Sequence, residues 1–187
     1  MNIQGEYKIG VPRQQVFDAI TDPKILQKCI PGCEELEQIS DTEYKAVIKA
    51  VIGPVKAAFK TSMQLKNLNP PESFTLAGEG KGGVAGFGRG SAEITLTESD
   101  GATHLRYEAE LKVGGKLAQV GSRLVLGVTR KIADEFFGTF SSILDSGAEK
   151  VETDQDKLLA GKRAARKRIM MIVGPILLLL LIYWLVK

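Results

Sequence analysis

Few residues in this sequence are of the types that form metal sites or catalytic relays. His104 is the only histidine, and Cys29 and Cys33 are the only cysteines in 187 residues. A structural zinc site takes four ligands, and these three residues fall short of that number. His104 also alternates with charged residues in the segment HLRYEAELKV, so we expect it to point to solvent. We therefore predict neither a metal site nor a histidine-activated nucleophile.

The two cysteines flank a Pro-Gly turn in the segment CIPGCE. Four residues apart, they could meet across the turn and act as a redox pair. The N-terminus has no basic flank followed by an apolar stretch, so we expect no secretory signal and a cytosolic domain, where a standing disulfide is disfavoured. We favour packing of two small apolar side chains, and a redox role would require a thiolate with a lowered pKa.

The segment GEGKGG, at residues 78–83, matches the dinucleotide-binding pattern G-x-G-x-x-G by letter. That pattern requires a helix to open behind it in a βαβ unit, whereas another strand follows here. The seven glycines from Gly78 to Gly90 instead predict a bent hairpin that leaves space over the concave face of a sheet. No acid pair stands out and the predicted inward faces are apolar, so we predict no catalytic residue.

The hydrophobic pattern changes its period along the chain. We expect a strand at 2–9, a helix that begins after Pro12, and a short helix from Asp22–Pro23 to Pro31–Gly32. Alternation with period two then predicts strands at 44–50, 59–65, 91–98 and 104–113. Apolar residues at helical spacing predict one long helix over 115–144. The fold class is therefore α+β, a curved antiparallel sheet wrapped around a long C-terminal helix.

The C-terminal residues have a different character. The formal net charge is +3, but a cluster of five basic residues lies immediately before an uncharged run from Ile169 to Val186. The cluster comprises Lys162, Arg163, Arg166, Lys167 and Arg168. The run would span about 27 Å as a helix, close to the hydrocarbon thickness of a bilayer. We favour a single-pass anchor at 169–186 over a buried helix, with the basic cluster on the cytoplasmic membrane surface and a linker at 146–168.

Several segments together resemble one protein family. They are CIPGCEEL, VIGPVKAAFK, NPPESF, GKGGVAGFGRGSAEITL, VGGKLAQVGSRL and ADEFFGTF, in that order. Over residues 1–145 the chain resembles the CoxG family of carbon monoxide dehydrogenase, which belongs to the START/Bet v 1-like (SRPBCC, helix-grip) superfamily. The resemblance implies a helix-grip domain with an internal apolar cavity. It also implies a partner, a molybdenum hydroxylase of the CO dehydrogenase type, and it assigns no catalytic residue.

The resemblance and the anchor together suggest a carrier that binds a respiratory quinone and couples the hydroxylase to the membrane. We expect no covalently bound cofactor, no nucleic-acid partner, and a quinone or other isoprenoid lipid as ligand. The head of the ligand could accept a hydrogen bond from Tyr44 or Tyr107. The expected lining, from inward strand positions and one helix face, is Tyr44, Ile48, Phe59, Met63, Phe74, Leu76, Phe87, Tyr107, Leu124 and Val128.

Two alternatives remain at this stage. In the first, the protein is a non-catalytic factor that recruits or assembles the hydroxylase at the membrane. In the second, weaker one, it is an enzyme of the polyketide-cyclase type, for which the predicted inward faces lack acids and bases.

Overall fold

The computed structural model describes residues 1–146, and Met1–Asp145 form one compact unit. The predicted anchor at 169–186, its flank from Lys162 to Arg168, and the linker after residue 146 lie outside the described residues and stay predictions. Among residues 1–146, no helix combines the length and apolar character that crossing a membrane requires.

Seven strands form a single sheet in the order β1-β7-β6-β5-β4-β3-β2, and every neighbouring pair is antiparallel. The strands are β1 (Asn2–Ile9), β2 (Cys33–Ser40), β3 (Glu43–Ile52), β4 (Val55–Asn69), β5 (Ser73–Lys81), β6 (Phe87–Ser99) and β7 (Ala102–Gly114). Strands β2 to β7 follow each other as a meander, and β1 pairs with the last of them. The predicted antiparallel sheet is confirmed, although the edge strand β2 was not predicted because its exposed acids hide any alternation.

Two short helices connect β1 to the opposite edge of the sheet. They are α1 (Arg13–Thr21) and α2 (Pro23–Cys29), and they meet at Asp22 as predicted. The Asp22 carboxylate accepts a hydrogen bond of 2.7 Å from the Lys24 backbone N–H, while Pro23 occupies the first helical position. This cap lets the chain turn sharply and start a second helix.

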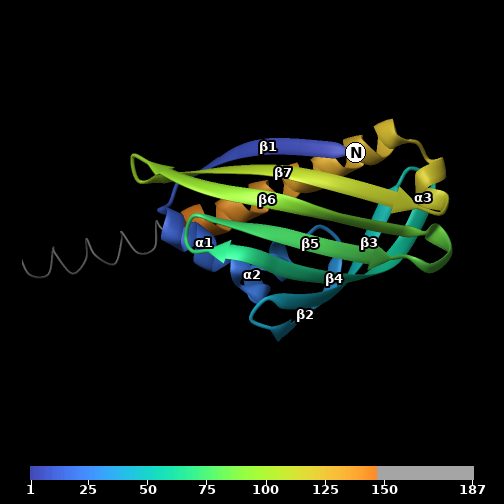
Figure 1. Cartoon of the computed structure of the whole chain (residues 1–187), viewed down its shortest axis with the longest axis horizontal. Coiled ribbons are helices and arrows are strands. Elements are labelled where there is room, and N and C mark those ends of the chain that lie inside the picture. Colours follow the sequence, from blue (N-terminus) through green and yellow to red (C-terminus); the bar gives the residue numbers. More distant parts are fainter. Residues whose placement is uncertain (147–187) are drawn as a thin grey trace, which may run out of the picture. The chain divides into compact units, whose positions relative to one another are not determined.

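The single long helix predicted over 115–144 is wrong at its start. A one-turn helix, α3 (Lys116–Gln119), is followed by a break at Gly121, and the long helix covers 122–146 of the described residues. Gly121 has a φ of +96°, a conformation that interrupts a right-handed helix and that glycine adopts without steric cost. Figure 1 shows the sheet curving around the long helix, in orange and gold, with α1 and α2 at the end opposite α3.

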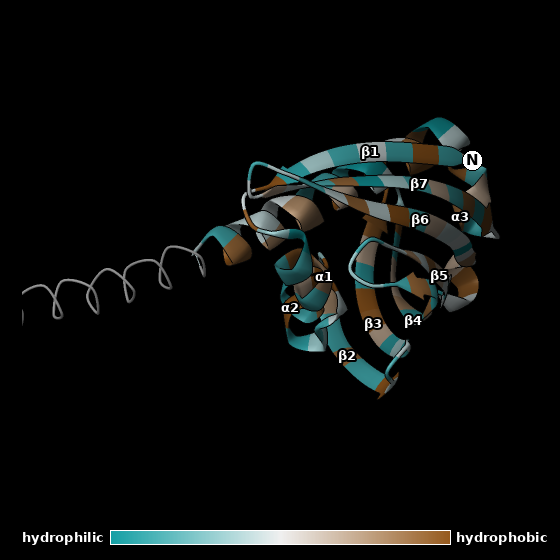
Figure 2. Ribbon diagram, turned by 60° about the vertical axis from the view of Figure 1, so that its left-hand side comes forward, coloured by the Kyte–Doolittle hydropathy of each residue, from teal (hydrophilic) through white to brown (hydrophobic). Residues whose placement is uncertain are grey.

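The alternation along the strands sets the two faces of the sheet. On β7, Leu105 is fully buried and Tyr107 is 9% exposed, whereas His104 and Arg106 are exposed. Hydrophobic and hydrophilic residues accordingly alternate along the ribbons of β1, β6 and β7 in Figure 2. The inward residues and the long helix enclose the interior, where the site must be sought.

The glycine-rich segment forms the predicted hairpin. β5 and β6 are joined through a 3-10 turn, η1 (Gly83–Ala85), and their register places Gly78 opposite Gly90 and Gly80 opposite Gly88. Because these strands carry no side chains at four facing positions, the inward surface is low there and neighbouring side chains fold over it.

Candidate ligand cavity

An apolar cavity of about 330 Å³ lies between the concave face of the sheet, α2 and the long helix. This volume is at the lower end of the range of small-molecule pockets, which begins near 300 Å³. The lining consists of Ile20, Leu26, Ile30, Pro31, Tyr44, Ile48, Met63, Leu65, Phe74, Leu76, Ala92, Ile94, Tyr107, Thr129, Ile132, Ala133, Phe136 and Phe137. None of these described lining residues is charged, so the cavity offers an apolar ligand no desolvated ion to compete with.

Six of the ten residues that the sequence suggested line this cavity. They are Tyr44, Ile48, Met63, Phe74, Leu76 and Tyr107. The structure thus brings together inward positions from β3, β4, β5 and β7, as their alternation indicated. Whether these six bind a ligand stays a prediction.

The other four suggested residues lie elsewhere. Phe59 is buried in a separate cluster with Ala85 and Leu117, which fills the interior at the end where the long helix begins. Phe87 and Leu124 are 38% and 43% exposed, and Val128 is half-buried outside the lining. The Phe59 cluster closes one end of the interior, so the cavity lies further along the helix than the sequence suggested.

The helix residues that do face the cavity were missed. Ile132, Ala133, Phe136 and Phe137 line it from the long helix, although Ile132 and Phe136 continue the i, i+4 series that runs through Leu124 and Val128. That spacing was the available signal, because a side chain one or two turns further along the helix occupies the same face.

Aromatic rings form one wall of the cavity. Phe137 stacks on Tyr7 with ring centroids 4.1 Å apart and lies 6.0 Å from Tyr107, at an interplanar angle of 17°. Phe136 meets Phe137 edge-on at 5.0 Å. Offset and edge-to-face pairs at these distances hold rings in fixed orientations, so the wall presents ordered π-faces to the cavity.

Gly5 makes room for this wall. A Cβ atom at Gly5 would lie 2.6 Å from a Tyr107 ring carbon, closer than any van der Waals contact allows. The Tyr107 ring therefore lies across β1 at the one position where the neighbouring strand has no side chain, as the register Gly5–Tyr107 requires.

The few hydroxyl groups around the cavity already have partners. The Tyr44 hydroxyl donates to the Thr21 carbonyl at 2.9 Å, and the Thr129 hydroxyl donates to the Val125 carbonyl at 2.9 Å. The Tyr44 proton is thus directed to the backbone and not to a ligand. Burial raises the pKa of Tyr44, and the negative charges of Asp22 and Asp41 raise it further.

A second hydroxyl pair lies behind the aromatic wall. The Tyr7 hydroxyl donates to the Asp134 carboxylate at 2.8 Å and is also hydrogen-bonded to Tyr107. Burial, followed by the hydrogen bond to Asp134, raises the pKa of Tyr7, and burial raises the pKa of Tyr107. These phenols stay protonated at neutral pH, so their role in the described structure is to tie β1 and β7 to the long helix.

The residues considered for metal or redox chemistry are not assembled into a site. His104 lies on the exposed face of β7, and residues 1–146 hold no group of three His, Cys, Asp or Glu placed for a metal. Cys29 is buried and Cys33 half-buried, both as free thiols. Burial raises the pKa of each thiol, which is the opposite of what an activated cysteine needs.

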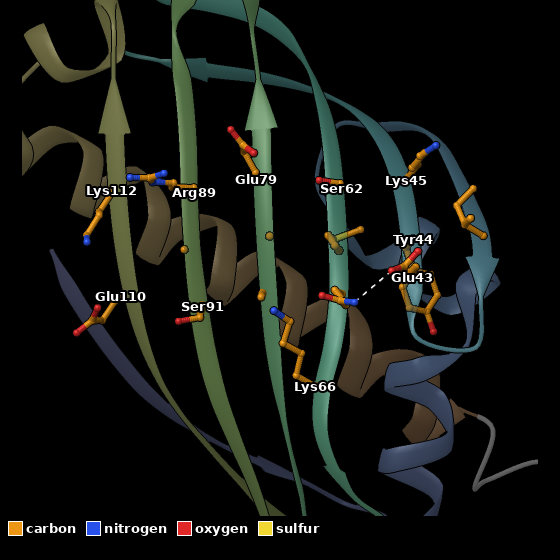
Figure 3. Close-up of a pocket in the computed structure, with 16 residues that line it drawn as sticks. Glu43, Tyr44, Lys45, Ser62, Lys66, Glu79, Arg89, Ser91, Glu110 and Lys112 are labelled. Carbon is orange, nitrogen blue, oxygen red and sulfur yellow. Dashed lines mark hydrogen bonds between the residues drawn. The ribbon is translucent and has the colours of Figure 1, made fainter.

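A polar hollow of about 600 Å³ lies on the outer face of the sheet (Figure 3). Small residues such as Ser62 and Ser91 occupy it, and charged side chains from five strands surround them. The register sets Lys45, Ser62, Glu79, Arg89 and Lys112 side by side in one row. This hollow is exposed and charged, so the apolar cavity is the better candidate for an apolar ligand.

Comparison with solved structures identifies the class of fold. The chain is similar to Ara h 8.0201 (15% identity, TM-score 0.57, covering 78% of this chain and 98% of that one). It is also similar to the Zhui aromatase/cyclase from Streptomyces sp. R1128 (10% identity, TM-score 0.58, covering 78% and 93%). These likenesses show the fold alone, which is the Bet v 1-like fold of the START/SRPBCC superfamily.

The family itself follows from the sequence match. The family model of the carbon monoxide dehydrogenase component CoxG matches residues 5–145, and the chain belongs to this family. A conserved protein from Geobacillus kaustophilus is 32% identical, with a TM-score of 0.74, and the match covers 78% of this chain and 96% of that one. No curated protein matches the chain.

Proposed function

We propose that the domain is a binding protein for an apolar, ring-bearing lipid, and that this lipid is a respiratory quinone delivered to a CO dehydrogenase-type molybdenum hydroxylase. One observation carries the proposal. The cavity is lined by apolar and aromatic side chains, and no charged residue contributes to the described lining. An isoprenoid tail gains about 0.8 kcal/mol for each CH₂ removed from water, so such a lining is a favourable environment for it.

The aromatic wall suits the quinone ring. Tyr107, Phe136 and Phe137 have fixed orientations, and a planar ring can stack against them. Quinone carbonyls only accept hydrogen bonds, while the Tyr44 and Thr129 protons are directed to backbone carbonyls. Stacking and shape, more than hydrogen bonding, would therefore hold the ring.

The cavity is too small to enclose a long isoprenoid tail completely. The rest of the tail needs an apolar surface outside, and the helix continues the lining with Ile132, Val128 and Leu124 at i, i+4 spacing. Ile132 is 36% exposed although it lines the cavity, so it lies where the interior meets solvent. In this proposal the ring enters first and the tail follows the helix outward.

Membership of the CoxG family supports the hydroxylase as partner, because the family is named as a component of CO dehydrogenase. Membrane attachment through 169–186 completes the proposal, since the quinone resides in the bilayer. An enzymatic role is disfavoured because the described lining holds no acid or base for proton transfer.

The test uses one strand and its two faces. Ala92 lines the cavity, whereas Ser91, the residue before it on β6, is exposed on the opposite face. Ala92→Phe therefore places a ring inside the cavity, and Ser91→Phe places the same ring outside as the matched control. The full chain is purified in mild detergent, its lipids are extracted and identified by mass spectrometry, and electron transfer from the hydroxylase to membrane quinone is measured.

We expect the wild-type chain and Ser91→Phe to carry an isoprenoid quinone and to support coupling, and Ala92→Phe to lose both while it stays folded. A chain that neither carries nor takes up quinone would refute the carrier. Coupling that survives in Ala92→Phe with an empty cavity would establish the alternative, a protein that only recruits or assembles the hydroxylase at the membrane.

A further inference from the structure

The end of the domain around the β3–β4 turn, η1 and the start of the long helix exposes apolar side chains. Seven large hydrophobic residues are exposed in residues 1–146, and four of them lie at this end. They are Val51 (59% exposed), Val84 (86%), Phe87 (38%) and Leu124 (43%), which we call the apolar end. An exposed set of this kind needs an explanation, because burying it elsewhere in the same fold would be favourable.

These four residues belong to segments that pack together. Gly53, in the β3–β4 turn, is so close to the long helix that a Cβ there would lie 2.6 Å from a Leu124 methyl group. The η1 turn contacts the end of β7, since a Cβ at Gly86 would clash with the Gly114 carbonyl. Figure 1 shows η1 between β5 and β6, α3 and the start of the long helix at the same end of the sheet.

Val84 is held outward by a fixed turn. Its neighbour Ala85 is 4% exposed in the cluster with Phe59 and Leu117. Backbone hydrogen bonds from Ala85 N–H to the Gly82 carbonyl (3.1 Å) and from Gly82 N–H to the Gly86 carbonyl (2.8 Å) close the turn. The exposure of Val84 is thus imposed by an anchored turn, and the side chain projects from the surface at its tip.

The charge around the apolar end is of one sign. Residues 51–60, 81–90 and 112–126 contain no Asp or Glu. Their charged residues are Lys56, Lys60, Lys81, Arg89, Lys112, Lys116 and Arg123. Lys81 pairs with Glu79 at 3.8 Å, and within residues 1–146 the other six form no ion pair.

From these observations we propose that the apolar end is a docking surface for an anionic lipid bilayer, with Val84, Val51 and Leu124 entering the headgroup region. Aliphatic side chains on projecting turns, surrounded by lysine and arginine, are the chemistry that interfacial membrane binding uses. A protein partner would more often meet an aromatic core with few lysines. The surface is separate from the predicted C-terminal anchor.

The position of the surface gives it a purpose. Leu124 is exposed at the apolar end, and Val128 and Ile132 continue from it along one face of the helix to the cavity lining. An apolar molecule that leaves the bilayer at this end meets a continuous apolar path inward. Docking itself does not depend on the identity of the ligand, so it can hold even if the quinone proposal fails.

The experiment places a fluorescent reporter at each end of the full chain. Trp184 is the only tryptophan, and Trp184→Phe removes its emission. In that background Val84→Trp reports on the apolar end. Leu68→Trp is the matched control, since Leu68 is also exposed (41%) but lies at the far end of β4 from the β3–β4 turn. Both variants keep residues 146–187, so any anchoring by that segment contributes equally.

The variants are reconstituted in phosphatidylcholine vesicles with or without phosphatidylglycerol, with brominated acyl chains as quenchers. We expect several-fold stronger quenching and a blue shift for Val84→Trp relative to Leu68→Trp in anionic vesicles. The difference should shrink in neutral vesicles, and also when Lys56, Lys116 and Arg123 are replaced by Gln. Equal quenching of both reporters would overturn the proposal. Shielding of Val84→Trp only on addition of the hydroxylase would also overturn it and assign the surface to that protein.

Discussion

Leu65 and Leu105 make it possible to test whether the cavity is empty in solution. Both are inward strand residues that are almost fully buried, with exposures of 7% and 0%. Leu65 lines the cavity, whereas Leu105 does not and is paired with Leu96 and Tyr7 on the neighbouring strands. The change Leu→Ala removes the same atoms at both positions, so a difference in cost reports on the surroundings alone.

The expected magnitudes follow from those surroundings. Leu→Ala in a packed core costs about 2.7–5 kcal/mol, and the cost rises with the volume of the void it leaves. Leu105 has neighbours on all sides, so its loss should cost about 4 kcal/mol. Leu65 already faces empty space on one side and has fewer dispersion contacts to lose, so we expect about 2.5 kcal/mol. A difference of about 1.5 kcal/mol corresponds to roughly tenfold in the folding equilibrium constant.

The free energy of unfolding is measured by urea denaturation of residues 1–146, stripped of lipid and followed by circular dichroism. The m-values must agree between variants for the free energies to be compared. Equal destabilisation by Leu65→Ala and Leu105→Ala would refute the reasoning, because it would mean that the space beside Leu65 is filled in solution. Adding back a bound lipid should then raise the cost of Leu65→Ala, since the lipid supplies the missing contacts.

Two further predictions concern the aromatic wall. Gly5→Ala should destabilise the domain by about 1–3 kcal/mol and alter its near-ultraviolet circular dichroism, because the new Cβ collides with the Tyr107 ring. Gly88→Ala, whose Cβ would meet only a methyl group at 3.9 Å, should change stability little, and equal effects would contradict the assigned cause. The pKa of Tyr7 is raised in the folded state, so its contribution to stability is complete below about pH 10 and is lost as pH rises above it. Tyr7→Phe should therefore reduce the alkaline loss of stability seen in denaturation at increasing pH, and an unchanged slope would argue against this burial.

The strand faces and the first helices were predictable from short stretches of sequence. Alternation identified the inward positions of β3, β4, β6 and β7, and Asp22–Pro23 marked the junction of α1 and α2. Such features depend on neighbours two to four residues away, which the sequence shows directly. The edge strand β2 escaped because an exposed edge does not require alternation.

The sequence by itself determined the CoxG family, the helix-grip fold and the face of each strand that turns inward. Tertiary structure alone decided where the interior is filled and where it is empty. The cluster of Phe59, Ala85 and Leu117 joins three segments distant in sequence and fills one end, while Tyr7 and Phe137, 130 residues apart, stack as a wall at the cavity. Periodicity reports which side chains are removed from water. Whether they meet each other or leave a void depends on the summed volumes of side chains from many elements, and these come together only in the folded chain.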